Sequence, residues 1–228
     1  MSGNIKVVET INWSEINTVL LDMDGTLLDL NFDTEFWLEH VPSSIAKKKN
    51  ISLEDAKEEM MSKYHSVSGQ IEWYCLDYWQ KELDLPILEL KQEISHLIKI
   101  RDDVIPFLDA LKAAGKRIVL VTNAHPDSLS LKIEKTQLDS HISELISCHI
   151  FGVTKESQKL WQKLQSHLNF ESESTLFIDD SQQVLLAAQE FGIKHIMAVA
   201  NPNSQIPAKE LDGFINIEDY RELLKDIK

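Results

Sequence analysis

Two carboxylates separated by a single residue are the groups in this sequence best suited to chemistry. Asp22 and Asp24 follow the apolar run at residues 19–21 and precede the pair Gly25-Thr26, where glycine permits a sharp bend of the chain. Carboxylates this close repel each other unless a cation lies between them. The spacing therefore predicts a divalent metal site, and an Asp-Gly turn without any chemistry is the alternative.

Three further groups of polar residues occur downstream, each near the end of an apolar run or the start of a helical segment. Because the carboxyl ends of parallel strands lie side by side, residues far apart in the sequence can meet there. With the first carboxylate pair, these groups offer a nucleophile, a proton-transfer carboxylate, a hydroxyl, a cation and a second acidic pair for a metal. They are Thr122, Asn123, Lys155, Asp179 and Asp180. Two simpler interpretations stay open, since Thr122 could merely end a strand and Asp180 could merely cap a helix.

The elements that must position these residues are strands alternating with helices. Apolar runs of strand length predict strands at residues 17–22, 117–122, 145–150, 175–178 and 194–199. The segments between the later strands have apolar residues at helical spacing, and this alternation indicates right-handed βαβ units. The predicted fold class is therefore α/β, with a doubly wound parallel-sheet (Rossmann-like) core of about five strands.

Residues 31–101 depart from this alternation. Charged residues there alternate with Leu, Ile, Met and aromatic residues at helical spacing, and one helix of this stretch is predicted from residue 86 to about residue 100. The pattern predicts an inserted α-helical cap at 31–101 and a core formed by 1–30 and 102–228. Aromatic residues at helical spacing usually pack inside such a layer rather than stack on a purine base; here they are Trp73, Tyr74, Tyr78 and Trp79. His125, beside Thr122-Asn123, is interpreted as a loop residue.

The composition narrows the classes of function. A net charge of -14 over 228 residues argues against a nucleic-acid polymer or an anionic membrane surface as partner. No apolar run approaches the ~18 residues of a membrane span, and residues 1–10 lack the apolar stretch of a secretory signal. Cys75 and Cys148 stand in no metal or redox spacing, so we expect two reduced thiols in a cytoplasmic protein.

Four of these motifs, in this order along the chain, resemble those of the haloacid dehalogenase-like phosphohydrolases. They are Asp22-x-Asp24-Gly25-Thr26, Thr122-Asn123, Lys155 and Phe177-Ile178-Asp179-Asp180-Ser181. The helical insertion after the first motif is similar to the helical cap of that family. The longer strings at residues 22–30, 73–79, 122–126 and 177–181 look closest to its bacterial GMP/IMP nucleotidase branch.

The resemblance implies Mg²⁺-dependent phosphoryl transfer through an aspartyl-phosphate intermediate. Asp22 would attack phosphorus, and Asp24 would protonate the leaving alkoxide and then activate the water that releases phosphate. Mg²⁺ would be bound by Asp22, the backbone carbonyl of Asp24 and Asp179. Asp180 would support this set through a metal-bound water or by holding Lys155.

The same resemblance implies a small phosphomonoester as substrate, above all a purine nucleoside 5′-monophosphate such as GMP or IMP. Thr122 and Lys155 would bind the phosphoryl oxygens, and Asn123 would add its backbone N–H. Asp24 separates the chain from the halide-releasing branch, which lacks a carboxylate there. The alternatives are a phosphosugar phosphatase or mutase of the same fold, and a non-catalytic metabolite-binding or regulatory module, against which the crowded carboxylates argue. These motifs do not indicate an oligomeric state.

Overall fold

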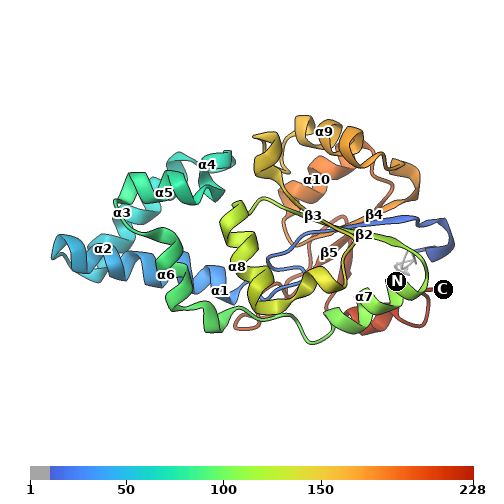
Figure 1. Cartoon of the computed structure of the whole chain (residues 1–228), viewed down its shortest axis with the longest axis horizontal. Helices are drawn as coiled ribbons and strands as arrows, with labels where there is room; N and C mark the ends of the chain where they lie inside the picture. Colours follow the sequence, from blue (N-terminus) through green and yellow to red (C-terminus); the bar gives the residue numbers. More distant parts are fainter. Residues whose placement is uncertain (1–10) are drawn as a thin grey trace, which may run out of the picture.

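A parallel β-sheet forms the centre of the computed structural model, which describes residues 11–228; the expectation about a signal at 1–10 lies outside them. The sheet has six strands in the order β3-β2-β1-β4-β5-β6, and all neighbouring strands are parallel (Figure 1). The strands are β1 (Thr18–Leu21), β2 (Arg117–Thr122), β3 (Glu144–Ser147), β4 (Thr175–Asp179), β5 (His195–Val199) and β6 (Ile215–Ile217). This confirms the predicted α/β fold class.

Helices cover both faces of the sheet. The helices α7 (Val104–Ala113) and α8 (Pro126–Thr136) pack on one face, and α9 (Gln158–Leu168) and α10 (Gln182–Phe191) on the other (Figure 1). In β1 the side chains alternate, because Val19 and Leu21 join the first hydrophobic layer and Leu20 joins the second. Burial on both faces explains why β1 reads as a continuous apolar run rather than an alternating one.

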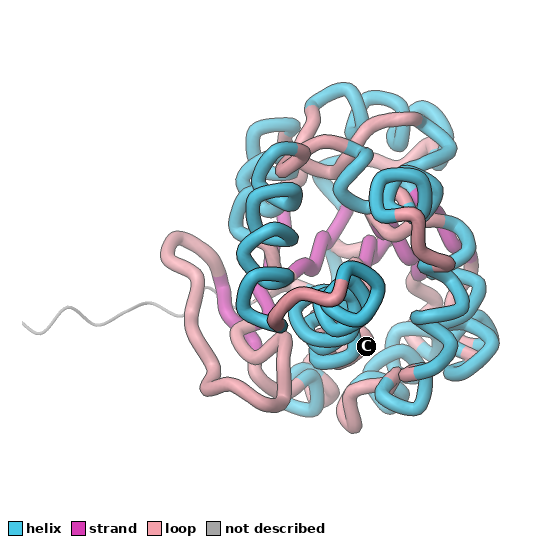
Figure 2. The backbone as a smooth tube through the Cα atoms, turned by 90° about the vertical axis from the view of Figure 1, so that its left-hand side faces the viewer, coloured by secondary structure: helices cyan, strands magenta, loops and turns pink. Residues whose placement is uncertain are grey.

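A group of helices inserted after β1 lies beside the sheet and has a hydrophobic cluster of its own. Figure 2, viewed from that side, shows these helices in front of the strands. Phe36, Trp79 and Ile87 are completely buried within the cluster. The helices are α1 (Asn31–Glu35), which continues through a π-helical turn (Phe36–His40) into α2 (Val41–Lys49), and then α3 (Leu53–Ser66), α4 (Ile71–Tyr74), α5 (Leu76–Leu83) and α6 (Ile87–Glu93). No helix of the described residues is long and apolar enough to cross a bilayer.

Two predicted elements end earlier than predicted, and one observed strand was not predicted. The strand predicted at 145–150 ends at Ser147, whose Oγ accepts a hydrogen bond from the N–H of His149 (3.4 Å) and so starts a 3₁₀ helix (Cys148–Phe151). The helix predicted to reach about residue 100 ends at Glu93, and a 3₁₀ turn (Ser95–Leu97) follows it. The short strand β6, paired with β5, was not predicted because its three residues are too few for a strand-length apolar run.

Candidate active site

Three neighbouring strands place polar residues at one edge of the sheet. Thr122 is the last residue of β2, Asp22 directly follows β1, and Asp179 is the last residue of β4. Because β1 pairs with both β2 and β4, these residues are brought to the same edge. All three are buried, and all three line one pocket. The juxtaposition predicted from the strand ends is therefore observed.

Lys155 supplies the positive charge at the centre of this edge. Its Nζ donates hydrogen bonds to Asp22 Oδ1 and to Asp179 Oδ2, the latter at 2.7 Å, and none of the three side chains is more than 8 % exposed. Burial opposes the charge of Lys155, but the two carboxylates raise its pKa well above the usual value. The backbone of Lys155 is held from both sides, since its N–H donates to Asn123 Oδ1 (2.9 Å) and its carbonyl accepts from Trp161 Nε1 (2.8 Å).

Three carboxylates form the part of the site that fits a divalent cation. Oxygens of Asp22, Asp179 and Asp180 lie within 4.8 Å of one another. Burial raises the pKa of all three carboxyls, that of Asp22 to about 6, and the charge of Asp179 raises the pKa of the other two further. A hard cation such as Mg²⁺ prefers carboxylate oxygens and would offset this repulsion. The donor set therefore fits the predicted magnesium.

Gly25 allows the chain to turn away directly beneath these carboxylates. Its φ of +84° lies in the left-handed region, which side chains other than glycine rarely adopt. A Cβ at this residue would lie 2.5 Å from Asp180 Oδ2 and 3.0 Å from the Cβ of Pro202. The sharp bend predicted after Asp24 is thus present, and only glycine leaves room for the Asp180 carboxylate.

Asp24 belongs to a second chain of charges, in which the two lysines are buried and the two aspartates are partly buried. Its Oδ1 accepts a hydrogen bond from Lys132 Nζ at 2.6 Å; Lys132 also contacts Asp33 Oδ2 at 2.5 Å, and Lys91 contacts Asp33 Oδ1 at 2.9 Å. Burial raises the pKa of Asp24 to about 7 even though Lys132 lowers it. Burial acts in the same direction on Asp33, but the two lysines outweigh it and hold its pKa well below the usual range. Sequence reasoning missed Asp33, Lys91 and Lys132, which lie on three different helices.

The three-carboxylate set and the two aspartates of the chain of charges that contains Asp24 line one pocket, which lies between the sheet edge and the inserted helices. Its empty volume is roughly 1130 Å³, including the open mouth. The insertion contributes mainly apolar and aromatic side chains, and Leu30, just before it, adds another; those of the insertion are Trp37, Leu38, Trp73, Tyr74 and Leu76. As predicted, Trp79 is buried inside the insertion, and Tyr78 packs against it there. Tyr74 and His125 instead face the pocket, which local spacing does not reveal.

Hydrogen bonds join the insertion to the core at one side of this pocket. The hydroxyl of Tyr74 donates to Glu156 Oε1 (3.0 Å), and Glu156 Oε2 accepts from Asn123 Nδ2 (3.1 Å). Burial, followed by the charge of Glu156, raises the pKa of Tyr74 above its usual range, so its hydroxyl stays a donor. Both polar atoms of the Asn123 side chain are therefore used to hold neighbouring residues, leaving its backbone N–H for the predicted contact with substrate.

A comparison with models of protein families identifies the family of this chain. Residues 16–192, which include all four predicted motifs, match the model of the haloacid dehalogenase-like hydrolases. The chain belongs to this family. Membership in the haloacid dehalogenase-like hydrolases confirms the predicted resemblance and makes the chain a hydrolase. Phosphoryl transfer through an aspartyl residue with Mg²⁺ is typical of the family's phosphatases, and the donor set described above fits it.

Individual relatives extend the match over nearly the whole chain. The GMP/IMP nucleotidase YrfG of Escherichia coli (strain K12) is 45 % identical over 217 residues, which cover 95 % of this chain and 98 % of the relative. A haloacid dehalogenase-like phosphatase from Thermococcus onnurineus has a similar structure, with a TM-score of 0.76, 22 % identity and coverage of 92 % and 97 %. An L-2-haloacid dehalogenase from Xanthobacter autotrophicus shares the fold at a TM-score of 0.59, with 15 % identity and the same coverage. At such identities the two structures support the fold alone.

Proposed function

We propose that this protein is a Mg²⁺-dependent phosphomonoester hydrolase that acts on purine nucleoside 5′-monophosphates such as GMP and IMP. The observation that carries the proposal is a pair of carboxylates, the buried Asp22 and the partly buried Asp24, which line one pocket together with Lys155. A phosphoester bound there would meet a nucleophile, an acid and a cation together. The nucleotide substrate is supported by the 45 % identity to the E. coli GMP/IMP nucleotidase.

Asp22 is the proposed nucleophile. It attacks phosphorus and forms an acyl phosphate, while the bond from phosphorus to the nucleoside oxygen breaks. Its pKa of about 6 leaves the carboxylate mostly ionised at neutral pH, as attack requires. Lys155, hydrogen-bonded to Asp22 Oδ1, orients this carboxylate and offers positive charge to the phosphoryl oxygens. The Thr122 side chain lines the same pocket and is the proposed hydroxyl contact of the phosphoryl group.

Asp24 is the proposed acid and base. It gives its proton to the leaving nucleoside oxygen and then takes a proton from the water that hydrolyses the acyl phosphate. A pKa of about 7, raised by burial, suits a group that must do both near neutral pH. Lys132 holds one of its oxygens, which leaves the other for the reaction. Bound Mg²⁺, with Asp22, the Asp24 carbonyl and Asp179 as proposed ligands and Asp180 as support, would reduce the repulsion between carboxylate and phosphate.

The insertion is the proposed source of substrate preference. We propose that residues 31–101 form a cap and that 1–30 and 102–228 form the catalytic core, a division supported by the separate hydrophobic cluster of the inserted helices. Trp37 and Trp73 offer ring surface to the pocket, and a purine has a flat apolar face that such rings bind. Because the inserted helices lie over the sheet edge, they would exclude water while Asp22 attacks phosphorus.

The proposed partner is a small molecule, and the proposed compartment is the cytoplasm. A net charge of -14 disfavours long-range attraction to polyanions such as nucleic acids. Cys75 and Cys148 are both free thiols, which supports a reducing environment.

Phosphate release from a panel of phosphomonoesters tests the proposed function. The purified chain is incubated with Mg²⁺ and GMP, IMP, AMP, pyrimidine nucleotides and sugar phosphates, and inorganic phosphate is measured. We expect the highest kcat/KM for GMP and IMP, and loss of activity with EDTA that added Mg²⁺ restores. Release without a bisphosphate primer excludes a mutase, a sugar phosphate as best substrate contradicts the nucleotidase, and no release from any compound contradicts the enzyme.

Replacement of Lys132 by methionine tests the role of Asp24. The change removes the cation 2.6 Å from Asp24 Oδ1, whereas Asp33 keeps its ion pair with Lys91. Burial raises the pKa of Asp24 and the charge of Lys132 lowers it, so the pKa rises further when Lys132 is removed. We expect kcat to fall about 10-fold and the limb of the kcat/KM pH profile that reports loss of the Asp24 proton to move up by about one unit.

The profiles are measured at saturating Mg²⁺, with Lys135→Met as the matched control. Lys135 is exposed on the same helix, α8, so its removal should leave both kcat and the pH limb unchanged. A limb that stays at the wild-type pH in Lys132→Met would contradict the assignment of Asp24 as the acid.

A further inference from the structure

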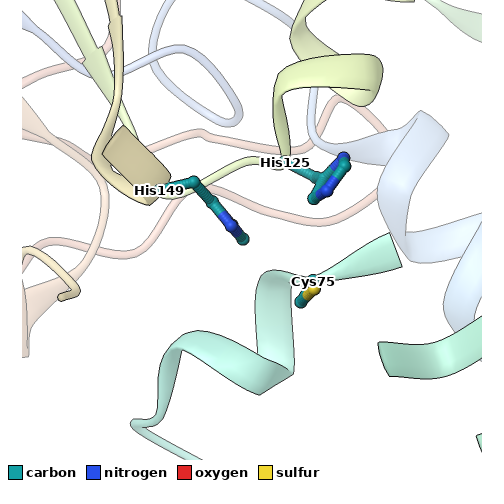
Figure 3. A group of neighbouring side chains, drawn as sticks. All are labelled: Cys75, His125 and His149. Carbon is teal, nitrogen blue, oxygen red and sulfur yellow. The ribbon is translucent and has the colours of Figure 1, made fainter. Parts of the chain in front are cut away.

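One cysteine and two histidines outside the carboxylate site face a common space where the inserted helices meet the core (Figure 3). Cys75 separates α4 from α5, His125 precedes α8, and His149 lies in the 3₁₀ helix (Cys148–Phe151) that follows β3. Their sulfur and nitrogen ligand atoms all lie within 4.8 Å of one another. None of them takes part in the proposed phosphate chemistry.

His149 presents an unused lone pair to this space. Its Nε2 is buried and has no hydrogen-bond partner among residues 11–228. A buried polar atom without a partner costs free energy, and a metal ion bound to this nitrogen would remove that cost.

His125 can also offer its Nε2 as a ligand. Its Nδ1 now accepts a weak hydrogen bond from the N–H of Asp127 (3.3 Å), while the Asp127 carboxylate lies 3.7 Å from the same nitrogen. Moving the ring proton to Nδ1 would direct it at this carboxylate and free Nε2 for a ligand.

We propose that Cys75, His125 and His149 bind a zinc-type transition-metal ion that holds the inserted helices against the core. One thiolate with two imidazoles is a ligand set for such ions, whereas the all-carboxylate site suits Mg²⁺. Tetrahedral zinc, with bonds of about 2.0–2.3 Å, holds its ligand atoms roughly 3.4–3.8 Å from one another. Side-chain rotations that move the three ligand atoms by about 1 Å would therefore complete the site. Binding releases the thiol proton of Cys75 to solvent.

The fourth position of the ion has a candidate ligand in the same region. Asp77 Oδ2 lies 3.7 Å from His125 Nε2, and its charge also acts on His149. Either this carboxylate or a water molecule would complete the tetrahedron. Cys75 directly follows Tyr74, whose hydroxyl is bound to Glu156, so the ion would add a second link between insertion and core beside an existing one. The site does not depend on the proposed function.

Titration of the metal-free full-length protein with Co²⁺, in excess Mg²⁺ to occupy the carboxylates, tests the site. Cobalt bound to thiolate in a tetrahedral site gives a charge-transfer band and intense visible bands, and carboxylate-bound cobalt gives neither. We expect one equivalent of such cobalt per chain, displaced by one equivalent of Zn²⁺. The band disappears in Cys75→Ser, and the affinity of His149→Ala falls by at least the roughly 10–100-fold that loss of even a supporting residue costs.

Cys148→Ala and His65→Ala are the matched controls. Cys148 is the other free thiol and His65 is exposed on α3, so both variants should bind cobalt as the wild type does. Zinc should also slow amide hydrogen exchange at residues 71–79 in the wild type and not in Cys75→Ser. A wild-type protein without the charge-transfer band, a band that persists in Cys75→Ser, or exchange that zinc does not change would overturn the proposal.

Discussion

Replacement of Asp22 by asparagine is expected to lower kcat/KM for GMP by about 10⁴-fold or more, the scale seen when a covalent nucleophile is removed. An amide has the size of the carboxylate and still contacts Lys155, but it cannot form the acyl phosphate. The fold should be retained, because the uncharged amide would not repel the Asp179 carboxylate. The measurements are phosphate release at saturating Mg²⁺ and thermal unfolding of the same preparation.

Asp102→Asn is the matched control for this substitution. Asp102 is exposed on the core surface before α7, so the same change of carboxylate to amide there should leave kcat/KM within about two-fold of the wild type. Folded Asp22→Asn with more than a tenth of the wild-type activity would remove Asp22 as nucleophile. The rest of the proposed site would then need a different attacking group.

Most of the fold was predictable because buried parallel strands have a strong sequence signature. The apolar run before Asp22 ends where β1 ends, and the runs before Thr122 and Asp179 end one residue before the ends of β2 and β4. Once the fold class is known, strand order places these ends side by side, so the meeting of the four motifs follows from topology. β6 escaped prediction because pairing with β5, rather than its own residues, makes it a strand.

The parts of the site that escaped prediction depend on contacts between helices. Lys132 and Asp33 look like ordinary polar residues of amphipathic helices, and only the packing of α1 beside α8 turns them into the buried partners of Asp24. Cys75 was likewise interpreted as an ordinary reduced thiol, because its spacing from Cys148 matches no metal or redox motif. The histidines within 4.8 Å of it come from the segments that follow β2 and β3, and no local pattern contains all three.

Replacement of Lys155 by methionine is expected to have a large effect on both activity and stability. Lys155 is the cation between Asp22 and Asp179, and both carboxylates are buried. Removing one member of a buried ionic group leaves its partners uncompensated and typically costs about 3–5 kcal/mol of unfolding free energy. The loss of its contact with the phosphoryl oxygens should lower kcat/KM by about 10³-fold as well.

Mg²⁺ should recover much of the stability and little of the activity. A divalent cation among Asp22, Asp179 and Asp180 replaces the missing positive charge, so thermal unfolding of Lys155→Met should depend far more steeply on Mg²⁺ concentration than that of the wild type. Lys159→Met is the matched control, because Lys159 is exposed on α9 and lies outside the set of residues that line the pocket. Equal Mg²⁺ dependence in Lys155→Met and wild type would show that the cation does not bind at these carboxylates.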